Sequence, residues 1–335
     1  MLRQFVSTGE SMSAKPSIAI TMGDPAGIGP EIVVRALADP LVQQVAFCHV
    51  VGSRSVLEDA CKRCDLPTTI LDSQYACVDD VRIVQAGTYQ YGEISAECGM
   101  ASFEYIKRAI DLAQAGKVQA VATAPINKES LRAGSIPFIG HTEIFGELTD
   151  THDPLTLFEV RNLRVFFLSR HVSLKKACEL VTKERIVDYV MLCTKALEQL
   201  GITEGTMAIA GLNPHSGEHG LFGREEVEAV APAVESLQKA GYNVTGPVSA
   251  DSVFHLALQG RFNSVLSLYH DQGHIATKTY DFERTISITC GMPILRTSVD
   301  HGTAFDIAGS GKASAVSMIE AIAVAAKYAP FWKAQ

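Results

Sequence analysis

Short apolar runs alternate with longer amphipathic stretches along most of the chain. The runs 17–22, 118–122 and 264–269 are rich in Val, Ile, Leu and Ala, which is the pattern of buried strands. Between the runs, residues 31–37 and 99–115 carry apolar side chains at helical spacing. Strands and helices in this alternation predict an α/β fold with a parallel sheet and right-handed crossovers.

Two apolar runs stand closer together than the others. Residues 155–160 and 163–169 are separated by a short polar turn, so we expect paired strands there. Ser173 follows the second run and Ser53 follows an earlier strand pattern at 45–51. Both serines precede helical patterns and are expected to cap those helices.

Composition is that of an ordinary globular protein, with 47% hydrophobic and 20% charged residues. A chain of 335 residues is long enough for one large α/β unit or two domains. The net charge of −8, without a long basic block, argues against a nucleic-acid partner. No apolar run approaches the roughly 20 residues that span a bilayer, so we expect no membrane segment.

The first residues, 1–14, lack the apolar middle of a secretory signal and are expected to form a disordered leader, with Met12 as a possible alternative start. Eight scattered cysteines without a secretion signal indicate reduced thiols in a cytoplasmic protein. The segment GDPAGIGPE holds Gly23, Gly27 and Gly29, but not at the G-x-G-x-x-G spacing. We therefore assign no Rossmann fingerprint.

Three apolar strand patterns each end within a few residues in a histidine. These histidines are His171, His215 and His270. If the strands are neighbours, three imidazoles converge, and three neutral nitrogens form an open divalent-metal site. The alternative is three separate hydrogen-bonded histidines in loops, because no short spacing between them fixes a geometry.

Other polar residues are candidates for binding an anion or moving a proton. Lys278 and Arg296 suit a phosphate or a carboxylate, Lys278 as a point charge and Arg296 through two parallel hydrogen bonds. Asp251 is either a helix N-cap or a metal ligand or proton relay. His141 and Thr142 are either ligand contacts or a helix start capped by Thr142.

Six motifs, MGDPAGIGPE, TAPINK, GHTE, GLNPHSGE, YHDQGH and RTSVDHGTAFDIAG, occur in this order over most of the chain. Together they closely resemble the 4-hydroxythreonine-4-phosphate dehydrogenase family of pyridoxal phosphate biosynthesis and its paralogues. The resemblance implies a fold like that of isocitrate and isopropylmalate dehydrogenases, with a cleft between two α/β domains. Residues 15–140 with 297–335 would form the first domain, and residues 141–296 the second.

The resemblance also implies a homodimer whose active site uses both subunits. The implied reaction oxidises the 3-hydroxyl of a 4-phosphorylated four-carbon hydroxy acid with NAD or NADP, and decarboxylation follows. A divalent metal, zinc or else cobalt, manganese or magnesium, would assist. By resemblance the metal ligands are His171, His215 and His270, the substrate contacts are His141, Thr142, Lys278, Ser287 and Arg296, and the catalytic residues are Lys278 and Asp251; we also expect cofactor contacts from Asn213, Asp300 and His301.

Two positions depart from the pattern of the biosynthetic enzymes. Ser287 stands where these typically have Asn, and the chain reads DQGHI, with His274, where they often read DQGLP. The His274 form resembles the paralogues that oxidise 4-phospho-D-threonate or 4-phospho-D-erythronate, and also the dihydrodiol dehydrogenase of terephthalate breakdown. Retained Lys278 and Arg296 favour a phosphorylated substrate. The sequence leaves open NAD against NADP, amino acid against sugar acid, and a metal-dependent hydrolase or lyase without nicotinamide.

Overall fold

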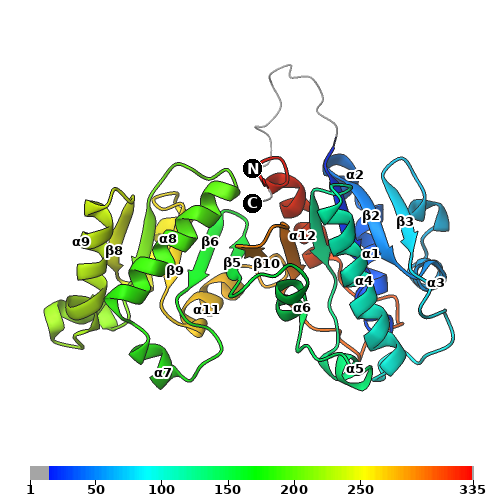
Figure 1. The fold of residues 1–335 in the computed structure, drawn as a ribbon, viewed down its shortest axis with the longest axis horizontal. Coiled ribbons are helices and arrows are strands. Elements are labelled where there is room, and N and C mark those ends of the chain that lie inside the picture. The colour runs from blue at the N-terminus through cyan, green and yellow to red at the C-terminus, as the bar shows by residue number, and fades with distance from the viewer. Residues whose placement is uncertain (1–14, 334–335) are drawn as a thin grey trace, which may run out of the picture.

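Eleven strands form one continuous sheet in the computed structural model, which describes residues 15–333 (Figure 1). Their order across the sheet is β3-β2-β1-β4-β11-β10-β5-β6-β9-β7-β8. Figure 1 shows the helices gathered in two halves, with β5 and β10 between them. The predicted α/β class is confirmed.

Most expected elements lie within a few residues of their predicted bounds. The strands are β1 (Ser17–Thr21), β2 (Phe47–Gly52), β3 (Ala76–Asp80), β4 (Ala120–Thr123), β5 (Leu155–Val160), β6 (Leu163–Phe167), β7 (Met207–Ala210), β8 (Val244–Val248), β9 (Ser264–Ser267), β10 (Ile286–Cys290) and β11 (Arg296–Val299). The α-helices are α1 (Gly29–Ala38), α2 (Pro40–Val45), α3 (Arg54–Arg63), α4 (Ala96–Gln114), α5 (Lys128–Ala133), α6 (His141–Leu148), α7 (Leu174–Glu179), α8 (Lys183–Gln199), α9 (Ala231–Lys239), α10 (Ala250–Leu258), α11 (His270–Tyr280) and α12 (Val316–Tyr328). Short 3-10 or π segments occupy η1 (Thr68–Leu71), η2 (Pro214–Gly220) and η3 (Glu226–Val230).

The sheet is mixed, which corrects the expectation of a parallel sheet. The sheet has two parallel parts, β3-β2-β1-β4-β11 on one side and β6-β9-β7-β8 on the other. Between them, β10 and β5 run antiparallel to each other and to the strands on either side. The reason is connection length. Residues 161–162 join β5 to β6, and residues 291–295 join β10 to β11, whereas a parallel pair needs a crossover of about a dozen residues or more. The predicted pairing of β5 with β6 is confirmed.

Helix α12 is fastened to the centre of the sheet by a buried carboxylate. Glu159 on β5 is 1% exposed and accepts hydrogen bonds from Lys327 Nζ at 2.7 Å and Tyr328 OH at 2.6 Å. Arg164 on β6 lies 3.3 Å from the same carboxylate. The last helix is thereby tied to β5 and β6 as well as packed on β4 and β11.

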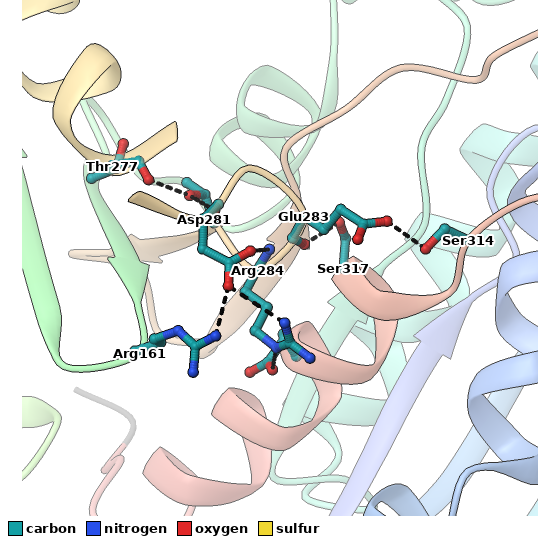
Figure 2. Close-up of polar contacts among 9 residues, drawn as sticks. Arg161, Thr277, Asp281, Glu283, Arg284, Ser314 and Ser317 are labelled. Carbon is teal, nitrogen blue, oxygen red and sulfur yellow. Dashed lines mark hydrogen bonds and ion pairs between the residues drawn. The ribbon is translucent and has the colours of Figure 1, made fainter. Parts of the chain in front are cut away.

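A second polar network surrounds the connection from α11 to β10 (Figure 2). Asp281 lies 2.9 Å from the guanidinium of Arg161 and accepts from the backbone N–H of Arg284. Arg284 also pairs with Glu320 of α12 at 2.9 Å, and the carboxylate of Glu283 accepts from Ser314. These contacts fix the carboxyl end of α11 against α12.

The two predicted caps differ in outcome. Ser173 caps α7, accepting from the backbone N–H of Lys176 as expected. Ser53 occupies the N-cap position of α3, but its hydroxyl donates to the carbonyl of Val84 at 2.6 Å instead of capping the helix. The predicted leader and Met12 lie outside the described residues. Within residues 15–333 no helix is long and apolar enough to cross a membrane, and all eight cysteines are free.

Candidate active site

A cavity of about 470 Å³ has its floor on one face of the three central strands β5, β10 and β11. Alternate residues of each strand point into it, because side chains along a strand alternate between the two faces. Residues from both halves of the chain complete the walls, for example Lys128 from the first half and His270 from the second. The expected cleft is therefore present. The floor residues are Thr156, Phe158, Ser287, Thr289, Arg296 and Ser298.

The three strands that precede the predicted metal ligands are neighbours. Strands β6, β9 and β7 pair in parallel in that order, so their carboxyl ends meet at one edge of the sheet. The rings of His171 and His270 lie 5.9 Å apart between centroids, and His274 lies 4.1 Å from His270. His215 does not line the cavity. Among the described residues, no group of three or more His, Cys, Asp or Glu side chains could hold a metal ion.

The backbone around His215 has an uncommon conformation. His215, Ser216, Glu218 and His219 all have positive φ, between 42° and 57°, in the segment η2. Left-handed residues other than glycine cost roughly 1–2 kcal/mol each, so the surrounding contacts must hold this turn in place. The carboxylate of Glu226 accepts from the backbone N–H of Leu212 and Asn213, both at 2.7 Å, and thereby anchors its start.

The imidazoles at the cavity are of the kind that binds metals. Burial lowers the pKa of His171, and the neighbouring Arg170 cation lowers it further. Burial also lowers the pKa of His274 to about 4, with a further contribution from His270. His270 Nδ1 lies 2.6 Å from the carboxylate of Asp271, a contact that orients the ring. Neutral imidazoles fit a divalent ion chemically, but one chain brings together only two of the three predicted ligands.

Arg296 is a buried cation on the floor of the cavity. Its side chain lies on β11, only 4% of the residue is exposed, and it donates to the hydroxyls of Thr289 at 2.9 Å and Thr123 at 3.1 Å. Within residues 15–333 it makes no ion pair with a carboxylate. Burial lowers its pKa to about 9, so it stays charged at neutral pH. An unpaired buried charge is costly, which makes the position suited to an anionic ligand.

Helix α11 presents three cavity residues at intervals of four. His270, His274 and Lys278 follow one face of the helix and all line the cavity. Lys278 Nζ lies 2.7 Å from Asp300 Oδ2, in the loop after β11. Burial raises the pKa of the Asp300 carboxyl. The pair places an ammonium group and a carboxylate next to the histidines, in position for proton transfer.

His141 and Thr142 both line the cavity at the start of α6. The helix start expected as an alternative is present, but Gly140 holds the N-cap position and Thr142 makes no cap hydrogen bond. The capping role of Thr142 is therefore wrong. His141 Nε2 is buried and has no hydrogen-bond partner in the described chain, and burial lowers the pKa of this ring. A buried, unpartnered nitrogen beside Arg296 is available to a ligand.

The remaining predicted residues are divided between the cavity and the surface. Ser287, Asp300 and His301 line the cavity. Asp251 is exposed in the first turn of α10, whose N-cap position is Ser249, and it does not line the cavity of this chain. Asn213 also lies outside the cavity. Its amide donates to Glu225 and Glu226, so its donors are used within the protein.

Several cavity residues were not predicted as site residues. Thr289 alternates with apolar residues in β10 (ISITC), whereas Thr156 stands in the mostly apolar β5 (LTLFEV), and both positions become informative once the two strands are known to be central. Arg170 also lines the cavity. In the sequence, the only sign of this role is that Arg170 stands directly before His171, a proposed metal ligand, at the end of a predicted strand.

Comparisons of the chain with known proteins point to one family. A family model described as pyridoxal phosphate biosynthetic protein PdxA matches residues 44–325. A Clostridium botulinum protein provisionally named D-threonate 4-phosphate dehydrogenase is 58% identical over 329 residues, covering 95% of this chain and 98% of its own length.

Solved structures agree with this assignment. The crystal structure of 4-hydroxythreonine-4-phosphate dehydrogenase from Klebsiella pneumoniae matches with a TM-score of 0.85 and 38% identity, covering 95% of this chain and 99% of that one. A terephthalate 1,2-cis-dihydrodiol dehydrogenase from Burkholderia xenovorans matches with a TM-score of 0.65 and 29% identity, over 94% and 98% of the two chains.

Proposed function

This chain belongs to the PdxA family and is a dehydrogenase of that family, and from this premise we propose that it oxidises the 3-hydroxyl of 4-phospho-D-threonate with NAD or NADP. The β-keto acid formed would then lose carbon dioxide. The observation that carries the proposal is the buried, unpaired Arg296 in the cavity floor, because an anionic substrate would supply the counterion that the protein lacks.

The charges of the cavity favour a sugar acid over an amino acid. Lys128, Arg170, Lys278 and Arg296 line it, and the one carboxylate among its lining residues, Asp300, is engaged by Lys278 at 2.7 Å. Among residues 15–333 this cavity therefore offers no free carboxylate to the ammonium group of 4-phosphohydroxy-L-threonine, whereas a 2-hydroxyl needs only a neutral partner. The name of the Clostridium relative supports the same choice.

Each residue near the proposed substrate has a distinct task. In its neutral amine form Lys278 takes the proton of the 3-hydroxyl, and the ammonium group so formed, paired with Asp300, later donates that proton to the product carbon. Arg296, with His141 and Thr142, holds the anionic end of the substrate. When bound, the nicotinamide supplies a hydride acceptor, and a divalent metal supplies a Lewis acid for oxidation and decarboxylation.

We further propose that the metal site is shared between the two subunits of a homodimer. His171 and His270 would come from one subunit and His215 from the other, since one chain gathers only the first two. Exposed apolar side chains follow each of these histidines within a few residues, as an interface requires. They are Val172 at 44%, Leu221 at 72%, Phe222 at 51% and Ile275 at 64% exposure.

Absorbance of reduced nicotinamide tests the proposed reaction directly. Zinc-, cobalt-, manganese- and magnesium-loaded protein is assayed with NAD and NADP on 4-phospho-D-threonate, 4-phospho-D-erythronate and 4-phosphohydroxy-L-threonine. We expect reduction with 4-phospho-D-threonate, release of carbon dioxide, and loss of both on chelation. Reduction with the amino acid alone would place the protein in pyridoxal phosphate synthesis. Substrate loss without reduction would indicate a hydrolase or lyase, and activity on a terephthalate dihydrodiol alone would replace the proposal.

A further inference from the structure

Arg170 is a second guanidinium in the cavity, and neither the metal nor the proton-transfer chemistry uses it. It follows β6, directly before His171, and lines the cavity from the side opposite β11. Its Nη1 donates a hydrogen bond to Thr156 Oγ1 on β5. The side chain is half-buried, and its charge lies close enough to His171 to lower the pKa of that imidazole.

Arg170 is hydrogen-bonded to a residue that lies in the same cross-strand row as Arg296. Thr156 on β5 is the direct cross-strand partner of Thr289 on β10, and Thr289 is the direct partner of Arg296 on β11. Arg296 Nη1 donates to Thr289 Oγ1 at 2.9 Å, just as Arg170 donates to Thr156. The two guanidinium groups are thus attached to hydroxyls on directly opposed residues, whose Cβ atoms lie about 4.5–5.5 Å apart in such pairs.

Neither guanidinium is paired with a carboxylate in the part of the chain that the structure describes. Among the ion pairs of residues 15–333, no carboxylate lies within 4.0 Å of Arg170 or Arg296. Two like charges held in one row repel each other, and burial makes the repulsion stronger. A group with a double negative charge and several acceptor oxygens would neutralise both guanidiniums and accept from each in planar geometry.

We infer that Arg170 and Arg296 form a two-guanidinium clamp that binds the phosphoryl group of the substrate, with the hydroxyls of Thr156 and Thr289 at its base. The inference rests on the proposed function for the identity of the ligand. It gives the substrate a direction. The phosphoryl end lies on the row formed by β5, β10 and β11, and the reacting end faces Lys278 and the histidines of α11.

Binding of inorganic phosphate tests the clamp without turnover. Titration calorimetry of the full chain with phosphate compares the parent with Arg170→Met, Arg170→Lys and Arg296→Met. We expect each methionine variant to bind phosphate roughly tenfold to a hundredfold more weakly, and the lysine variant to fall between, because it keeps the charge and loses the planar pair of donors. Arg82→Met, at an 82% exposed side chain outside the cavity, is the matched control and should bind as the parent does.

Kinetics provide the second measurement. Arg170→Met should raise KM for 4-phospho-D-threonate by a similar factor and change kcat much less, while binding of unphosphorylated D-threonate stays as in the parent. Arg170→Gln keeps a donor toward Thr156 and checks that lost binding is not lost folding. Phosphate binding unchanged in both Arg170→Met and Arg170→Gln would overturn the clamp, as would an equal loss for D-threonate.

The two proposals fail in different ways. A parent protein that binds phosphate through Arg170 but reduces no nicotinamide with any of the phosphorylated acids supports the clamp and refutes the proposed reaction. A parent that oxidises 4-phospho-D-threonate with the same KM after Arg170→Met supports the reaction and refutes the clamp.

Discussion

Lys278 Nζ lies 2.7 Å from Asp300 Oδ2, in an ion pair that joins α11 to the loop after β11. The pair connects two segments that both carry cavity residues, and the contacts of Asp281 and Arg284 hold the far end of α11 against α12 (Figure 2). The position of the lysine ammonium is therefore set from both ends of a short stretch of helix. A group that moves a proton in the transition state benefits from such fixed placement.

Replacing Lys278 by methionine should leave the fold intact and lower kcat. The side chains have similar length, and general acid–base catalysis typically contributes about 10²–10⁴ in rate. We expect a loss in that range with a smaller change in KM, measured by nicotinamide reduction under saturating substrate. A loss below roughly tenfold would reduce Lys278 to an ordinary substrate contact. Thr279→Val, at an exposed neighbour on the same helix, is the control and should retain activity.

Replacing Arg296 by methionine should weaken substrate binding without lowering the stability of the fold. The variant removes a buried charge that has no counterion, so the free energy of unfolding of the ligand-free protein should not fall. KM for the phosphorylated substrate should nevertheless rise at least about tenfold, because a charge-assisted contact is lost.

Arg164→Met is the matched control for that experiment. Arg164 is also largely buried, but it pairs with Glu159 at 3.3 Å, so its removal leaves a buried carboxylate with fewer partners. We expect this variant to lose stability in urea, by a few kcal/mol, and to keep the parent KM. Equal destabilisation by both substitutions would contradict the view that Arg296 is kept for an external anion.

Asp24 makes stability depend on pH. It is fully buried, one carboxylate oxygen accepts from the N–H of Ala26 at 2.9 Å, and the other has no partner in the described chain. Burial raises the pKa of this carboxyl from 3.8 to about 6. The unfolded chain therefore ionises more readily than the folded protein, and the folded protein loses stability as pH rises from about 4 through about 6.

Asp24→Asn should abolish that contribution. A difference of about two pKa units corresponds to about 3 kcal/mol, so the unfolding free energy of the variant relative to the parent should increase by up to that amount between about pH 4 and pH 7. Urea unfolding of both proteins at each pH measures the difference, and the other titrating groups cancel in the comparison. A difference that stays constant with pH would show that Asp24 keeps the same protonation state throughout.

Local signals were sufficient for the strands that end in histidines. The runs before His171, His215 and His270 are mainly apolar (LRVFF, MAIA and SVLS), and the change to polar residues marks the strand ends. That β6, β9 and β7 are neighbours follows from pairing between distant segments, so the sequence could state convergence only as a condition. The structure satisfies it for the strands and brings two of the three rings together.

The floor of the cavity was harder to predict for a physical reason. Strand β10 alternates apolar residues with Ser287 and Thr289, because one face packs in the core while the other faces the cavity. Strand β11 (RTSV) has polar residues on both faces, and its Arg296 and Ser298 line the cavity. Such short runs give no continuous apolar signal. The role inferred for Arg170 depends on the register that opposes Thr156 to Thr289, which no local pattern contains.

The shared metal site can be tested by mixing inactive subunits. His171→Ala and His215→Asn should each lose activity and bound metal, since two imidazoles hold a divalent ion poorly. Asn is chosen at position 215 because it tolerates the left-handed backbone there better than Ala does. In a mixed dimer of the two variants, one site would receive both defects and the other would receive intact ligands from both subunits.

Random exchange of these two variants should therefore restore activity and metal content to about a quarter of the parent, since half of the dimers are mixed and each has one intact site. The pair His171→Ala and His270→Ala is the control. Both ligands would come from the same subunit, so every site in that mixture keeps one defect and no activity should return. Recovery in neither mixture would mean that a single subunit supplies all three ligands, and recovery in both would mean that His171 and His270 belong to different sites despite lying 5.9 Å apart in one chain.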